Sequence, residues 1–136
     1  MSGLSYQEMQ KVLMEELRLY HLPIAVKYLF SDAELEDFKE NADYVTPVKN
    51  LTFCQWEIAA RMKGQTVLAL PDQLGCTNAA YVLGWRQFSE AEVLSHLKYV
   101  KNEEQAKRFL LNKPRLEEGK LKAIIVGPLG DSYFDP

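Results

Sequence analysis

The sequence predicts an α+β fold, or a related α/β fold, with a small mixed sheet of three to four strands covered by five to six helices. Three segments share one helix-start signal, a serine followed three residues later by a glutamate. In that arrangement each side chain accepts a backbone N–H of the first turn. Short apolar runs of strand type lie between the helical segments. This mixed order of strands and helices is typical of layered packing.

The first half of the chain alternates capped helices with strand-like runs. A helix begins at Ser5, carries apolar residues at helical spacing and ends before Pro23. A strand follows over 24–30, where Lys27 either guards a sheet edge against mispairing or points into a site. The next capped helix covers about 32–39, and the segment after it (44–49) is a short edge strand or a loop.

The second half is predicted from the same signals. Gly64 ends a helix over 53–63 that Thr52 caps. The strand that follows breaks at Pro71. That strand covers 66–70. The elements after it are helices over about 73–83, 90–100 and 103–111 and a strand over 122–129. The strand over 122–129 is a continuous apolar run, which is typical of a central strand. The helices over 90–100 and 103–111 carry apolar residues at core spacing.

Length and charge limit the classes of function. The 136 residues predict one domain, residues 1–136, either self-contained or the N-terminal part of a longer domain. The net charge of −3 and the pI of about 5.4 argue against nucleic acid as a partner. No apolar run reaches the roughly 20 residues of a membrane helix. The N-terminus has no signal-peptide pattern, so we expect a cytoplasmic protein with reduced cysteines.

The end of the chain indicates an unfinished sheet. Residues 131–136 include two aromatic side chains but no further capped element. This is consistent with a sheet completed by a missing segment or by a partner subunit, as in a homo-oligomer.

The two cysteines are the leading candidates for a ligand site. Cys54 lies in the first turn of the helix over 53–63, where the helix dipole favours a thiolate, and Cys76 lies near the next helix start. Together they could hold a soft metal or an iron–sulfur cluster, or carry a redox adduct. Against this, cysteine is often a small buried hydrophobe, and the 21 intervening residues match no C-x-x-C or zinc pattern.

Three further residues are secondary candidates. Asp72 either caps the following helix or supplies an acid beside Cys76. Trp85 and Arg86 are candidates for a partner-binding surface, because both residue types are common in interface hot spots. The alternative for Trp85 is that it covers the core.

The sequence leaves three functions open. The first is thiol-based binding through Cys54 and Cys76, and the second is a non-catalytic interaction module with buried, inert cysteines. The third is an enzyme in which Cys54 acts with a histidine, since such pairs need not be close in sequence. No dinucleotide fingerprint, P-loop, serine elbow or H-E-x-x-H motif is present.

Several short motifs together resemble a known family. They are Leu22-Pro23-Ile24-Ala25-Val26-Lys27, Phe53-Cys54-Gln55 with Ala59 and Gly64, Gly75-Cys76, Leu83-Gly84, and Gly127-Pro128-Leu129. In this order they are similar to the domain-of-unknown-function 169 family, the uncharacterised ArCR family of bacteria and archaea. The resemblance implies no particular reaction. It does include Cys54 and Cys76 in the shared pattern, and it implies that relatives continue beyond the last residues of this chain.

Overall fold

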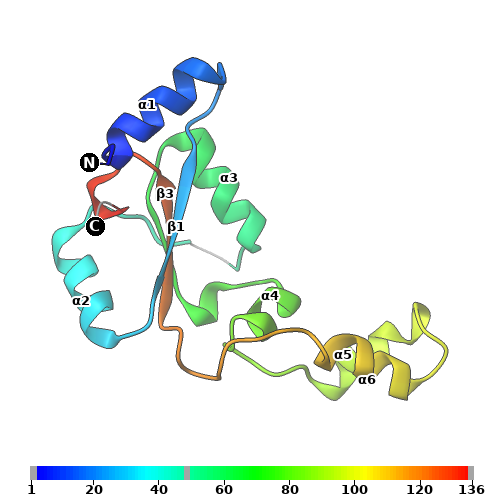
Figure 1. Cartoon of the computed structure of the whole chain (residues 1–136). Helices are drawn as coiled ribbons and strands as arrows, with labels where there is room; N and C mark the ends of the chain where they lie inside the picture. The colour runs from blue at the N-terminus through cyan, green and yellow to red at the C-terminus, as the bar shows by residue number, and fades with distance from the viewer. Residues whose placement is uncertain (1–2, 48–49, 135–136) are drawn as a thin grey trace.

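The computed structural model describes residues 3–47 and 50–134 and shows a three-stranded sheet with helices on both faces (Figure 1). The strands are β1 (Ile24–Leu29), β2 (Val67–Ala69) and β3 (Ala123–Pro128). The α-helices are α1 (Tyr6–Glu16), α2 (Asp32–Asn41), α3 (Phe53–Lys63), α4 (Thr77–Val82), α5 (Glu90–Ser95) and α6 (Glu103–Leu111). Three short 3-10 turns complete the described elements: η1 (Pro71–Gln73), η2 (His96–Lys98) and η3 (Ser132–Phe134).

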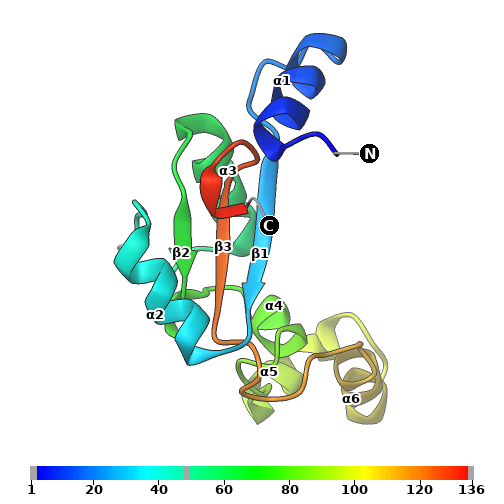
Figure 2. The ribbon, with the colours of Figure 1, turned by 60° about the vertical axis from the view of Figure 1, so that its left-hand side comes forward.

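The sheet has the order β1-β3-β2, with β3 in the centre (Figure 2). Both neighbours pair with β3 in antiparallel register, for example Val26 with Val126 and Val67 with Val126. The predicted α+β fold is confirmed, and so is the central position of the last strand. The sheet is antiparallel rather than mixed, because both of its strand pairings are antiparallel. Among the described residues the parallel contacts are two isolated bridges outside the strand pairings, Val45 with Val67 and Leu51 with Leu74.

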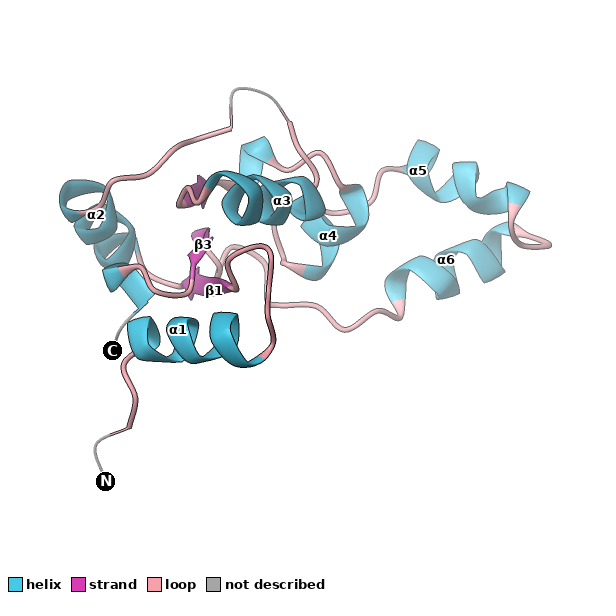
Figure 3. Cartoon of the chain, turned by 90° about the horizontal axis from the view of Figure 1, so that it is seen from above, coloured by secondary structure: helices cyan, strands magenta, loops and turns pink. Residues whose placement is uncertain are grey.

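Alternation along β3 divides the core into two layers. Ile124 and Val126 face α3, where they pack with Trp56, whereas Ile125 faces α2 and packs with Phe38. All six residues of β3 are buried, as expected for a strand covered on both faces. Figure 3 looks along the strands and shows them between α2 and α3.

The predicted helix starts are confirmed, but three helices end or begin elsewhere. Capping boxes form at Ser5, Ser31 and Ser89. The first helix stops at Glu16, well before Pro23, because Arg18 adopts a left-handed φ of 50° and Leu19 N–H closes the turn on the Met14 carbonyl. The helix predicted over 73–83 is shortened to α4, and the one over 90–100 becomes α5 followed by η2.

A further difference is the placement of α5 and α6. They pack on each other around Val93, Ala106 and Leu110 and project from the sheet as a helical arm, residues 86–115 (Figure 1). The apolar spacing predicted that both would join the core. That prediction was wrong for three residues, because Leu94, Leu97 and Phe109 are exposed.

The glutamates of the capping boxes make the stability of the fold depend on pH. The Ser89 backbone N–H donates to the Glu92 carboxylate at 2.8 Å and lowers the pKa of Glu92 below its ordinary value of 4.5, with a further contribution from Arg86. Hydrogen bonds from Ser5 and Ser31 lower the pKa of Glu8 and Glu34 in the same way. A carboxyl whose pKa is lower in the folded state stabilises the fold above pH 4.5, and this contribution is lost as pH falls through the folded pKa.

We therefore expect Glu92→Gln to be less stable than the wild type at neutral pH, and the difference to vanish well below pH 4.5. Urea unfolding at about pH 7 and about pH 3 measures both values. A difference that persists unchanged at the lower pH would show that the charge of Glu92 contributes nothing.

Candidate functional site

The segments that lead into α3 and α4 are hydrogen-bonded to each other. Leu51 and Leu74 form a parallel bridge. The Leu51 N–H donates to the Gln73 carbonyl at 3.2 Å, and the Gly75 N–H donates to the Leu51 carbonyl at 2.9 Å. A side chain at position 75 would meet the Asn50 carbonyl oxygen at 3.2 Å, so glycine allows this close approach. The starts of the two cysteine-bearing helices are therefore held side by side.

Cys54 is the second residue of α3 and is exposed. The Gln55 N–H donates to the Thr52 hydroxyl, and the Thr52 N–H donates to the Gln55 side-chain oxygen at 2.8 Å. This capping box fixes the first turn. Phe53 and Trp56 pack in the core on the inner side of the helix, which leaves the Cys54 thiol free on the outer side.

Cys76 is the N-cap residue of α4 and is half-buried against the core layer that contains Trp56. Its side chain makes no capping hydrogen bond. Both cysteines are free thiols and both stand at helix starts, as the sequence predicted. That they act together stays a prediction.

Asp72 does not cap α4, because α4 begins at Thr77 and its N-cap is Cys76. It is exposed in η1, the turn that leads to Gly75 and Cys76. An acidic role beside the thiols is still compatible with this position and stays a prediction.

Trp85 and Arg86 are both engaged within the chain. The Trp85 indole N–H donates to the Leu121 carbonyl at 2.8 Å, and the ring packs against the core. The Arg86 guanidinium, partly exposed, pairs with Glu92 at 2.5 Å. These contacts fix the base of the helical arm, and the predicted partner surface at this position stays a prediction.

The described residues contain no group of three or more His, Cys, Asp and Glu side chains that could hold a metal ion. His21 is exposed just before β1, and His96 lies in η2 of the arm with Nδ1 at 2.8 Å from the Glu92 carbonyl oxygen. Any metal at Cys54 and Cys76 would therefore be held by two thiols from this part of the chain. In the same described part, no helix is long and apolar enough to cross a membrane.

The sequence did not predict a polar hollow of about 460 Å³ at the opposite end of α3. Its lining includes Asp43, Thr66, Asp131 and Tyr133. The buried Thr66 hydroxyl donates to the Asp131 carboxylate, and the Asp43 N–H donates to the Tyr133 hydroxyl at 2.8 Å. Gly127 allows the close approach of Thr66, because a Cβ there would lie 2.6 Å from the Thr66 hydroxyl oxygen, but no sequence motif marked this contact.

A family model described as Uncharacterised ArCR, domain of unknown function 169, matches residues 12–136. No curated protein and no solved structure matches the chain. Since the match covers nearly the whole sequence, the chain belongs to the uncharacterised ArCR family, as the motifs around Cys54, Cys76 and Gly127 predicted.

Proposed function

We propose that this protein binds a thiophilic ligand through Cys54 and Cys76 acting as a pair. The observation that carries the proposal is the hydrogen-bonded pairing of the segments before α3 and α4, which holds two helix starts side by side. Each helix start bears one free thiol.

The exposure of Cys54 weighs against the alternative of two inert, structurally buried cysteines. A cysteine that served only as a core hydrophobe would lie on the inner side of α3, where Phe53 and Trp56 pack instead. Cys76 is half-buried, and its thiol makes no capping bond that would occupy it.

The ligand class follows from the number of donors. A closed zinc site needs four ligands, and the described chain offers two thiols with no third His, Cys, Asp or Glu grouped around them. Thiolates prefer soft cations. The proposed ligand is therefore a soft metal ion held by two sulfurs of one chain, with any further ligand supplied from outside these residues.

Cadmium titration of the reduced, chelator-treated protein tests this proposal, because thiolate-to-metal charge transfer reports sulfur coordination directly. We expect one ion per cysteine pair. Cys54→Ser and Cys76→Ser should each weaken binding by more than about 100-fold. The loss of a residue that only hydrogen-bonds to a metal ligand already lowers metal affinity by about 10–100-fold, and the loss of the ligand itself should lower it more. Ile58→Ser is the matched control, because Ile58 is exposed on α3 and is not a metal-ligand residue type, and it should change the affinity by less than either cysteine variant.

Equal binding by the wild type and both serine variants would overturn the proposal. So would tight binding that only one of the two substitutions removes, because a single thiol would then account for the site. Circular dichroism of each variant confirms that the fold is retained.

A further inference from the structure

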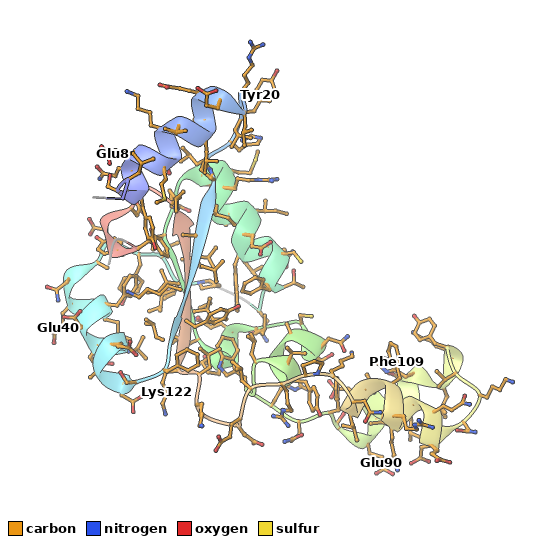
Figure 4. The ribbon with its side chains drawn as sticks, viewed as in Figure 1. Glu8, Tyr20, Glu40, Glu90, Phe109 and Lys122 are labelled. Carbon is orange, nitrogen blue, oxygen red and sulfur yellow. The ribbon has the colours of Figure 1, made fainter. Side chains whose placement is uncertain are left out.

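The helical arm ends in an uncovered apolar surface. Its exposed apolar residues are Leu94, Leu97, Tyr99, Phe109 and Leu111. Tyr99 is 73% exposed and Phe109 is 59% exposed, and both line a hollow of about 280 Å³ with His96 and Val100. Figure 4 shows Phe109 on the arm, apart from the sheet. Grouped exposed aromatic side chains of this kind mark interaction surfaces.

The arm is also basic, in contrast to the rest of the chain. Residues 86–115 contain seven Lys and Arg against four Glu, a net charge of +3, whereas the whole chain carries −3 and the remainder therefore carries −6. Two lysines lie over the exposed rings, Lys98 at 4.9 Å from the Tyr99 centroid and Lys113 at 5.1 Å from the Phe109 centroid. The surface is thus apolar at its centre and cationic at its rim, so it suits an apolar partner with acidic flanks.

Helix α1 of the same sequence has the properties of an apolar partner with acidic flanks. It has no buried residue, although it carries an apolar stripe, and Val12 (44%) and Leu17 (62%) are exposed. Residues 6–18 contain Glu8, Glu15 and Glu16 against Lys11 and Arg18, a net charge of −1, opposite in sign to the +3 of the arm. A helix of 11 residues is marginal by itself. Its first half is attached to the rest of the chain, because Tyr6 packs against the core and the Gly130 N–H donates to Gln10 at 2.8 Å, whereas Val12 and Leu17 follow in the second half.

The two surfaces cannot meet within one chain. Figures 1 and 2 show α1 and the arm at opposite ends of the molecule, and Figure 4 shows Tyr20, just after α1, far from Phe109. We infer that α1 of one copy docks on the helical arm of a second copy, and the reverse, in a two-fold dimer. The apolar centres match, and the acidic side chains of α1 face the lysines at the rim of the arm.

The two-fold arrangement is physically favourable because each copy supplies both contact surfaces. A two-fold axis makes the same contact twice, which doubles the buried area and closes the assembly at two copies. A single helix on a small hollow would fall short of the roughly 1,200 Å² of a stable interface. The inference does not depend on the thiol site, since none of these residues is near Cys54 or Cys76 in the sequence.

Sedimentation analysis of the full chain tests the dimer. Leu17→Asp, at the C-cap of α1, and Phe109→Asp in the arm each place a charge in both copies of the contact. Each should therefore weaken dimerisation by at least about tenfold, or 1.4 kcal/mol. Ile58→Asp is the matched control, because Ile58 is 52% exposed on α3, outside both surfaces. It should leave the dimer unchanged. Added salt should weaken the wild-type dimer, since the two rims carry opposite charges.

Mixing the two disruptive variants gives the decisive result. Homodimers of Leu17→Asp or of Phe109→Asp have both contacts damaged, whereas a mixed pair keeps one intact contact between the normal α1 of one chain and the normal arm of the other. We therefore expect the mixture to dimerise more tightly than either variant alone. A monomeric wild type, a dimer insensitive to both substitutions, or a mixture no tighter than its components would each overturn the inference. A monomer whose arm instead binds anionic vesicles would also overturn it.

Discussion

Replacing Trp56 by alanine is expected to lower the free energy of unfolding by about 3–5 kcal/mol, the usual cost of removing a fully buried aromatic side chain. Trp56 has no exposed surface and lies where α3 packs on the sheet, against Val126 and Leu74. Its removal would leave a cavity between these elements and loosen the first turn of α3, which carries Cys54. Urea unfolding measures the loss.

Trp56→Phe should cost much less, within about 1.5 kcal/mol, because the indole N–H of Trp56 is buried and has no hydrogen-bond partner among the described residues. An unsatisfied buried donor costs about 1–3 kcal/mol, so removing it offsets part of the lost packing. A cost of Trp56→Phe well above about 1.5 kcal/mol would contradict an unsatisfied indole N–H, because the loss of packing would then not be offset.

The second large effect is expected at Gly84, at the base of the arm. Gly84 has a φ of 72°, and a Cβ there would lie 2.7 Å from the Leu116 carbonyl oxygen and 2.8 Å from that of Glu117. Gly84→Ala therefore combines a left-handed conformation, which costs an L-residue about 1–2 kcal/mol, with a clash against backbone atoms that cannot rotate away. We expect a loss of at least about 3 kcal/mol in total, given the added cost of overpacking.

Gly119→Ala separates these two causes. Gly119 has a similar φ of 76°, but a Cβ there would have no other atom within 4 Å. Alanine at this position should therefore cost only the conformational part, about 1–2 kcal/mol. Thermal and urea unfolding of the two variants give the comparison. Equal losses at Gly84 and Gly119 would contradict the close approach at the base of the arm.

Local signals predicted the local structure well. The capping boxes at Ser5, Ser31 and Ser89 depend on residues three positions apart, so the sequence contains all the information they need. The end of the first helix was missed, because nothing in the residue type of Arg18 announces a left-handed conformation.

Contacts between segments that are distant in the sequence could not be predicted from local patterns. The spacing of Val93, Ala106 and Leu110 indicated buried helix faces but not that these faces pack on each other, away from the sheet. The Thr66–Asp131 hydrogen bond joins residues 65 positions apart, so the hollow that it lines had no local signature.

The candidate site at the two cysteines combines both cases. The sequence placed Cys54 and Cys76 at helix starts, and the structure shows both there. What brings these starts together is the Leu51–Leu74 bridge, a pairing between two segments that no motif announces.

The most direct test of the shared thiol site is bridging of Cys54 and Cys76 by a short bifunctional thiol reagent under anaerobic conditions, read by intact-protein mass spectrometry. We expect one reagent molecule to bridge both sulfurs within a single chain, leaving no free thiol, and prior loading with cadmium to block the reaction. Two reagent molecules per chain, each attached to one sulfur, would show that the thiols are too far apart to hold one ligand and would contradict the proposed function.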